Sequence, residues 1–321
     1  MSNLELIQRV ISELNQKIIG QEKLVDRLLI TLLADGHLLV EGAPGLAKTK
    51  AIKTLANAIE GAFHRIQFTP DLLPADITGT DIYRVEESKF SFEPGPIFNH
   101  FVLADEINRA PAKVQSALLE AMGERQVSVG RKTHKLPLLF LVMATQNPIE
   151  QEGTYPLPEA QLDRFLMKVC ISYPQREAEK KILHLARLEA ETGKSAAFTS
   201  SKMSQDVIFA ARKETLNLHM NDAVEEYIVQ LILATREPER YNGTLKNQIQ
   251  YGVSPRGTIA LDRCARVQAW LKGRDFVTPE DVQEVIFDVL RHRIGLQFEA
   301  EARGITPDEV IHQIVQVVPA P

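Results

Sequence analysis

The stretch Gly42-Ala-Pro-Gly-Leu-Ala-Lys-Thr49 decides the fold of this chain. It lies between a short apolar run, His37–Glu41, and a segment over 48–59 that has apolar residues at helical spacing. A strand, a glycine-containing loop and a helix in this order open a parallel α/β fold. Such a loop wraps backbone N–H groups around phosphate oxygens, and the positive end of the helix adds to the attraction. The stretch therefore predicts a phosphate-binding loop.

Two side chains at the end of this loop have the chemistry that a nucleotide site needs. Lys48 would reach the β- and γ-phosphates, and Thr49 would place its hydroxyl on Mg²⁺. Ala47 stands where the general pattern has a second glycine, which is a mild departure because alanine still leaves room for a phosphate. The alternative interpretation is a turn that only joins a strand to a helix.

Polar residues follow two further strand candidates. Phe101–Ala104 runs into Asp105 and Glu106, and Asn147 follows the strand candidate 138–144. Asp105 could hold Mg²⁺ through water, and Glu106 could orient an attacking water molecule. Asn147 would lie beside this pair, between the γ-phosphate and the water. Ligand sites of α/β proteins gather at such strand ends, although a solvated strand end and a turn asparagine remain the alternatives.

Three arginines are candidates for stabilising the negative charge that develops in phosphoryl transfer. Arg109 follows the acidic pair, Arg164 precedes the last strand candidate, and Arg256 stands at the start of a helix. Taken alone, an arginine is more often a surface charge or part of a structural ion pair.

The sequence pattern changes near Tyr173-Pro174, which predicts an α/β domain over residues 1–174 and an all-helical domain over 175–321. A small hairpin around Gly130 is expected before the fourth strand. The five strand candidates are His37–Glu41, Arg65–Phe68, Phe101–Ala104, Leu138–Ala144 and Leu166–Ile171. The helix candidates beyond residue 174 are Glu177–Glu191, Ser204–Leu216, Asp222–Arg236, Pro255–Leu271 and Pro279–Ile294.

Composition narrows the class of protein. The 321 residues carry a net charge of −5 and suggest about two domains, and the charge disfavours a broadly basic nucleic-acid surface. The two cysteines, Cys170 and Cys264, cannot form a disulfide framework and are expected to be small buried residues in a reducing compartment. There is no signal-peptide pattern and no apolar run of transmembrane length, so a cytoplasmic location is expected.

Taken together, these motifs resemble those of the MoxR family of AAA+ ATPases over about residues 3–313. Glu150-Gln-Glu-Gly-Thr-Tyr-Pro-Leu-Pro-Glu-Ala-Gln-Leu-Asp-Arg-Phe165 is far more specific than the phosphate loop alone. The other stretches are Ile18-Ile-Gly-Gln-Glu22, Gly42–Thr49, Asp105-Glu-Ile-Asn-Arg-Ala-Pro111, Ala144-Thr-Gln-Asn-Pro148 and Ser254-Pro-Arg256. Ala47 is normal in this family.

The resemblance implies a five-stranded parallel sheet of order 5-1-4-3-2 with an all-α lid. It also implies ATP or ADP with Mg²⁺ between the two domains, with Lys48 on one side and Arg256 on the other. Homo-oligomers of this family are rings, commonly hexamers. Arg164 resembles the arginine finger that enters the neighbour's site, and Arg256 resembles the lid arginine that senses the γ-phosphate. The hairpin around Gly130 and the stretches 68–76 and 83–92 resemble inserts that face the pore or the substrate.

The predicted site combines the motifs with the resemblance, and no role is predicted for Arg109 or Arg125. The catalytic candidates are Lys48, Asp105, Glu106, Asn147, Arg164 and Arg256. The nucleotide-binding candidates are Ile18, Ile19, Gly20 and Gln21 against the adenine, then Gly42, Ala43, Pro44, Gly45, Leu46, Ala47, Lys48, Thr49 and Lys50, and Arg256. The metal candidates are Thr49 and Asp105.

The function that the resemblance implies is ATP hydrolysis coupled to chaperone-like maturation or activation of a partner protein complex. Partners of this family often contain von Willebrand factor A domains. Two alternatives stay open. One is a DNA-remodelling translocase, which the net charge disfavours and a modest basic cluster of Arg125, Arg131, Lys132 and Lys135 favours. The other is a nucleotide-switched binding module with little turnover, which the intact acidic pair disfavours.

Overall fold

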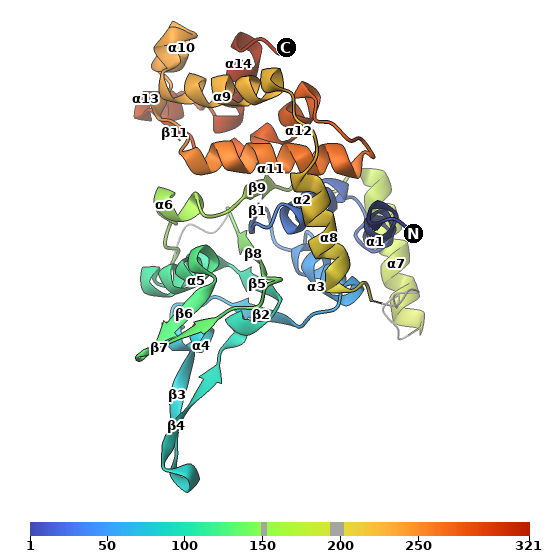
Figure 1. Ribbon diagram of the computed structural model, residues 1–321, viewed down its shortest axis with the longest axis vertical. Coiled ribbons are helices and arrows are strands. Elements are labelled where there is room, and N and C mark those ends of the chain that lie inside the picture. The colour runs from blue at the N-terminus through green and yellow to red at the C-terminus, as the bar shows by residue number, and fades with distance from the viewer. Residues whose placement is uncertain (149–152, 193–201) are drawn as a thin grey trace.

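A central parallel sheet organises the first half of the computed structural model, which describes residues 1–148, 153–192 and 202–321 (Figure 1). Its strands lie in the order β2-β5-β8-β1-β9. Counted along the chain within this sheet and read from β9, this order is the predicted 5-1-4-3-2. The strands are β1 (Leu38–Glu41), β2 (Phe63–Gln67), β5 (Phe101–Asp105), β8 (Leu141–Gln146) and β9 (Met167–Cys170). β8 begins three residues later than predicted, because Leu138 is exposed and outside the sheet.

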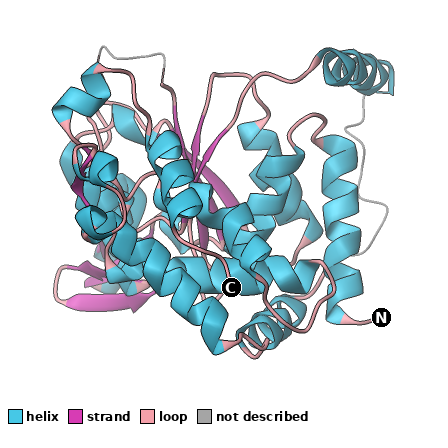
Figure 2. Cartoon of the chain, turned by 90° about the horizontal axis from the view of Figure 1, so that it is seen from above, coloured by secondary structure: helices cyan, strands magenta, loops and turns pink. Residues whose placement is uncertain are grey.

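Apolar residues cover both faces of the sheet, which explains why its strands are nearly continuous apolar runs. Leu38 and Val40 point to one face and Leu39 to the other. The first face packs against α1 (Asn3–Lys17), α2 (Glu22–Leu33), α3 (Lys48–Ala58) and α8 (Gln205–Leu216). The second packs against α4 (Pro74–Thr78) and α5 (Ala112–Glu124). Figure 2 shows the strands enclosed by helices on both sides.

Two antiparallel hairpins extend from this α/β part (Figure 1). The predicted hairpin around Gly130 is present as β6 (Gln126–Val129) and β7 (Lys132–Lys135). A longer hairpin, β3 (Gly79–Arg84) with β4 (Lys89–Pro94), projects at the end remote from the C-terminal helices. Its strands were not among the strand candidates. They bury few side chains, and without a buried face the apolar alternation that reveals a strand is weak.

The five helices predicted beyond residue 174 are present, with α12 ending at Leu290 rather than Ile294. This part is helical except for one short antiparallel pair of strands, Ile249–Tyr251 with Gly295–Leu296, which was not predicted. Strands of two and three residues are too short to leave a sequence pattern. Besides α8, the helices and strands beyond residue 174 are α7 (Arg176–Thr192), α9 (Asp222–Arg236), α10 (Gly243–Lys246), β10 (Ile249–Tyr251), α11 (Pro255–Leu271), α12 (Pro279–Leu290), β11 (Gly295–Leu296), α13 (Phe298–Ala302) and α14 (Pro307–Val317).

The C-terminal helices rest on the α/β part through α11 and α12. The guanidinium of Arg27 on α2 donates to Asp288 on α12 over 2.8 Å, and Arg291 donates to the Lys168 carbonyl on β9 over 2.8 Å. Cys264 is buried in α11, as expected, whereas Cys170 at the end of β9 is exposed. No helix within the described ranges is long and apolar enough to cross a membrane.

Candidate functional site

The predicted phosphate loop connects β1 to α3 and needs unusual backbone angles. Gly45 has φ +84°, and Ala47, which caps α3, has φ 57° in the left-handed region. A Cβ atom on Gly42 would lie 2.5 Å from Cγ1 of Ile171, so only glycine fits there. Ala47 therefore adopts the conformation that the more usual glycine would favour, at a cost of about 1 kcal/mol. Alanine at this position is therefore compatible with the turn that leads into α3.

The start of α3 is suited to an anion. Its N-terminus has no side-chain cap, so the first N–H groups and the positive end of the helix dipole are available to an oxyanion. Lys48 folds back over the loop and donates to the Gly42 carbonyl over 2.6 Å. Burial lowers the pKa of Lys48, while Asp105, Glu106 and Glu41 oppose this shift. The lysine is thus held at the loop, facing the acidic pair.

A hollow of about 410 Å³ lies in front of this helix. It brings together the phosphate loop with Asp105, Glu106 and Asn147, as predicted. Asp105 ends β5, and Asn147 follows the neighbouring strand β8 and is 7% exposed. The residues that line this hollow are Pro44, Gly45, Leu46, Ala47, Lys48, Thr49, Lys50, Arg65, Asp105, Glu106 and Asn147.

Both carboxylate oxygens of Asp105 accept hydrogen bonds. The buried hydroxyl of Thr145 donates to Oδ1 over 2.6 Å. The guanidinium of Arg65, on β2, donates to Oδ2 from Nη2 over 2.6 Å and from Nε over 3.0 Å. The position of Asp105 is therefore fixed from β8 on one side and from β2 on the other.

Glu106 has a strained backbone, with φ 56° and ψ 50° in the left-handed region. Its N–H donates to the Thr145 hydroxyl over 2.9 Å, which helps to stabilise this conformation. Its Oε2 atom accepts from Gln67 over 3.0 Å and lies 3.2 Å from Nε of Arg109. The turn after β5 thus aims the Glu106 carboxylate at the hollow.

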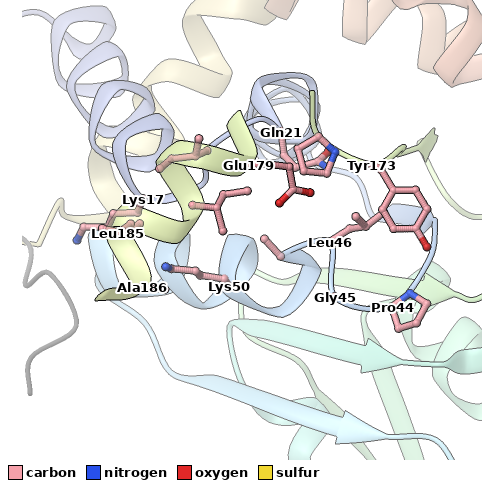
Figure 3. Close-up of a pocket in the computed structure, with 14 residues that line it drawn as sticks. Lys17, Gln21, Pro44, Gly45, Leu46, Lys50, Tyr173, Glu179, Leu185 and Ala186 are labelled. Carbon is pink, nitrogen blue, oxygen red and sulfur yellow. The ribbon is translucent and has the colours of Figure 1, made fainter. Parts of the chain in front are cut away.

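A second hollow of about 290 Å³, drawn in Figure 3, adjoins the first, because both are lined by Pro44, Gly45, Leu46, Ala47 and Lys50. Ile19 and Gln21 line it, and Gln21 donates to the Ser172 carbonyl over 2.9 Å. Ile18 does not, because it is 1% exposed and belongs to the core. Gly20 turns the chain between Ile19 and Gln21 at φ +75°, and a Cβ atom on Gly20 would lie 2.8 Å from Cβ of Ala178. Only part of the predicted segment 18–21 therefore faces this hollow.

Residues that the sequence did not identify complete the second hollow. Tyr173 and Pro174 come from the chain after β9, and Ile182, Leu185 and Ala186 come from α7 (Figure 3). Apolar side chains above a phosphate loop suit the flat face of a base. They escaped prediction because the helical periodicity of α7 gave no reason to place it beside residues 17–21.

Arg164 and Arg256 are not among the described residues that line either hollow. Both arginines therefore lie away from the two hollows. The phosphate loop follows the end of β1, where Ile171 donates to the Glu41 carbonyl. The segment of Arg164 meets the other end, where Leu166 donates to the His37 carbonyl. Four residues of strand separate the two ends by about 13 Å.

The contacts of the two arginines place them together on that remote side. Arg164 donates to the Leu119 carbonyl of α5 over 2.7 Å. Arg256 is exposed at the start of α11, and Ser254, which caps this helix, donates to Asp163 over 2.8 Å. Arg256 therefore does not line the hollow of Lys48 in its own chain, and its place across the nucleotide from Lys48 stays a prediction. The packing of α11 on the β9 side, which no local pattern reveals, sets its position.

Three polar residues of the first site were missed or left without a role: Arg65, Gln67 and Arg109. Gln67 pairs in register with Asp105 across β2 and β5, so the predicted strand order could have identified the neighbouring strand as a source of site residues. The stretch Glu150–Phe165 begins in residues 149–152, outside the described residues, and its described part carries α6 (Glu159–Leu162).

The donors present fit Mg²⁺ with a nucleotide. The Thr49 hydroxyl and the Asp105 carboxylate are hard oxygen ligands on the same hollow. Within the described ranges there is no group of three or more His, Cys, Asp or Glu residues that could hold a metal alone. A site with one carboxylate is typical of Mg²⁺ that takes its remaining ligands from phosphates and water.

The fold and the site define an AAA-type P-loop ATPase with a lid. A family profile described as "ATPase family associated with various cellular activities (AAA)" matches residues 37–167, and an AAA lid domain profile matches 244–314. Chaperone MoxR1 of Mycobacterium tuberculosis is 47% identical over 100% of this chain and 84% of its own length. Protein MoxR of Methylorubrum extorquens is 32% identical over 96% and 93%. The chain belongs to the MoxR family of AAA+ ATPases.

Two further comparisons agree with this assignment. YeaC of Bacillus subtilis is 42% identical over 98% of this chain and 95% of its own length. A solved structure from Cytophaga hutchinsonii, assigned as an ATPase, superposes with a TM-score of 0.90 at 44% identity. That match covers 99% of this chain and 96% of the other, so the resemblance extends over both the α/β part and the C-terminal helices.

Proposed function

We propose that the protein hydrolyses ATP in a Mg²⁺-dependent reaction and uses the conformational change to act on a partner protein. The observation that carries the proposal is the single hollow that joins Lys48 of the phosphate loop to Asp105, Glu106 and Asn147. The adjoining hollow, with Ile19, Tyr173 and the α7 side chains, would take the adenine. The first hollow gathers charged and polar groups, and the second adds apolar side chains, which suits the two ends of a nucleotide.

Each residue of the first hollow has a task in this reaction. Lys48 and the N–H groups of α3 bind the phosphates, and Glu106 orients the water for in-line attack on the γ-phosphate. Asn147 can hold the water or a γ-phosphate oxygen. Thr49 and Asp105 would hold Mg²⁺, which neutralises phosphate charge when it is bound.

The position of the two remote arginines supports the proposal that ATP turnover requires several chains to assemble. Arg164 and Arg256 lie on one side of the molecule, away from the loop of their own chain, where a neighbouring chain could receive both of them. A ring, proposed here as a hexamer, would place this side against the neighbour's γ-phosphate. Hydrolysis in one protomer would then change the contact with the next, which is a conformational output.

The output that we propose is chaperone-like maturation or activation of a protein complex in the cytoplasm. The name Chaperone MoxR1, borne by a 47% identical relative, supports this class of role. The division of the chain near residue 174 lies at the second hollow, which Tyr173 and Glu179 both line. We propose that domains 1–174 and 175–321 move relative to each other there. A client with a von Willebrand factor A domain follows from the family resemblance.

DNA remodelling is the second candidate, and the structure weakens the feature that favoured it. Arg125 is paired with Asp35 over 2.5 Å and donates to the Leu138 carbonyl. It is therefore part of the base of the β6–β7 hairpin rather than of a free basic cluster. Arg131, Lys132 and Lys135 alone would make few phosphate contacts, so DNA stimulation with a steep salt dependence is not expected.

Phosphate release from ATP tests the proposal. The wild-type chain should release phosphate in the presence of Mg²⁺, with a specific activity that rises with protein concentration as rings form. Lys48→Ala should abolish nucleotide binding and release together. Nucleotide binding without phosphate release at the highest protein concentration would favour the nucleotide-switched module. Stimulation by DNA that falls steeply with salt would favour the translocase.

A further inference from the structure

Arg65 donates twice to one carboxylate oxygen of Asp105, Oδ2. Two of its nitrogens, Nη2 and Nε, lie 2.6 and 3.0 Å from Oδ2. The Nη2 atom also donates to Oε1 of Gln67 over 2.7 Å, which holds the guanidinium in place. Arg65 lines the same hollow as Lys48. A second cation of this chain is thus directed at the carboxylate that the proposed function assigns to Mg²⁺.

The other oxygen of Asp105, Oδ1, is held in place by a buried hydroxyl group. Thr145 is fully buried, and its hydroxyl donates to Oδ1 over 2.6 Å while accepting the N–H of Glu106. Turning Oδ1 away would leave this buried hydroxyl group without an acceptor, which is costly. The carboxylate is therefore fixed in orientation, and a metal or metal-bound water that takes Oδ2 must displace Arg65 from it. A guanidinium that already donates twice to this oxygen would repel a divalent cation placed beside it.

We infer that Arg65 and Mg²⁺ compete for Oδ2 of Asp105, so that Arg65 sets the Mg²⁺ concentration at which the site loads. This inference rests on the proposed function, because it assumes a nucleotide site that takes Mg²⁺. Arg65 is a positioning residue here: it acts through Asp105 rather than on the nucleotide. Its side chain is 50% exposed, so it can leave Asp105 for solvent without a large penalty.

The test measures the affinity for ADP by titration calorimetry at a series of fixed Mg²⁺ concentrations, and in EDTA. With Arg65→Met, the Mg²⁺ concentration that gives half of the maximal gain in ADP affinity should fall about three- to fivefold, the range that an exposed ion pair allows. Arg65→Lys keeps the charge without the two-pronged donor and should give an intermediate value. A thermal melt of each variant checks that it is folded.

Arg109→Met is the matched control. It removes a guanidinium of the same charge from the same site, but the partner of Arg109 is Glu106, 3.2 Å away, and not Asp105. Its Mg²⁺ midpoint should stay at the wild-type value. An unchanged or higher midpoint in Arg65→Met would overturn the inference, and so would equal shifts in both variants, because net charge alone would then explain the effect. A wild-type chain that binds no ADP at any Mg²⁺ concentration would overturn the proposed function itself.

Discussion

The hydroxyl of Ser254 donates a hydrogen bond to the carboxylate of Asp163, with Oγ 2.8 Å from Oδ2. The other oxygen of Asp163 accepts from Nε of Arg293 over 2.8 Å. Asp163 directly precedes Arg164 in the chain, and Ser254 lies two residues before Arg256. One carboxylate therefore ties together the two segments that carry the arginines which we propose to act on a neighbouring chain, and it joins the α/β part to the C-terminal helices.

Replacing Asp163 should destabilise the protein strongly. Arg293 is 5% exposed, and in Asp163→Ala its guanidinium would stay buried without a counter-charge. Removing one partner of a buried ion pair costs about 3–5 kcal/mol. Ser254→Ala, which removes only the hydroxyl and the cap of α11, should cost about 1 kcal/mol. Urea unfolding of both variants gives the comparison, and equal losses would show that the Asp163–Arg293 pair contributes little.

Glu106→Gln should bind ATP normally and nearly stop turnover. The amide keeps the size of the side chain and an oxygen that can accept from Gln67, but it cannot orient and polarise water as a carboxylate does. Loss of such a group lowers rates by about 10²–10⁴-fold. Nucleotide affinity and phosphate release measured on the same preparation test this. Glu120→Gln, an exposed change on α5, is the control, and wild-type turnover in Glu106→Gln would rule out this role for Glu106.

Mixed rings test whether the remote arginines act on a neighbour. Arg164→Ala keeps an intact loop, and Lys48→Ala keeps an intact arginine, so a mixture should regain part of the activity that each lacks alone. Because Ser254 ties α11 to Asp163, we expect the same recovery when Arg256→Ala is mixed with Lys48→Ala. Recovery with Arg164→Ala but not with Arg256→Ala, in rings shown to be mixed, would mean that Arg256 acts within its own chain.

Residues whose tasks are set by local geometry could be predicted from the sequence. Lys48 follows a loop of fixed length, and Asp105 stands at the end of an apolar strand, so their meeting at one edge of the sheet follows from a parallel fold. Arg256 could not be placed in this way. Its position depends on how α11 and α12 pack against α2 and β9, through non-local contacts such as Arg27 with Asp288.

The segment 18–21 shows a second limit of sequence-based prediction. Ile18 and Ile19 are chemically the same, yet one lies in the core and the other lines the hollow. The turn at Gly20, where α1 meets α2, decides which of them faces inward. Arg65 was missed for a related reason: a charged residue inside a strand candidate gives no sign of its neighbour until the strand order and the register are known.

His37 is a buried residue whose hydrogen bonds require a neutral ring. The Val142 N–H donates to Nδ1 over 3.1 Å, so Nδ1 must be unprotonated, and Nε2 faces the Met122 carbonyl at 3.4 Å. Burial lowers the pKa of His37 to about 4, and the nearby Arg125 adds to this effect. Protonation would force two donors, Nδ1–H and the Val142 N–H, against each other in the core.

The stability of the protein should therefore fall on mild acidification. Between the ordinary histidine pKa of 6.5 and the folded value of about 4, the unfolded chain binds a proton at His37 that the folded chain does not. The stabilising contribution is complete above pH 6.5 and is lost progressively as the pH falls toward 4. From pH 7.5 to 5.5 the loss from His37 amounts to about 1 kcal/mol.

The variant His37→Gln isolates this contribution. The glutamine amide can accept from Val142 and donate toward Met122 without titrating, so the drop in unfolding free energy between pH 7.5 and 5.5 should shrink by about 1 kcal/mol. His292, also buried and with its pKa held well below 6.5 by burial and by Arg293, is unchanged in this variant and keeps its own share of the acid sensitivity. Urea unfolding at the two pH values measures the difference. A drop as large in His37→Gln as in the wild type would mean that the ring of His37 is not the group that titrates.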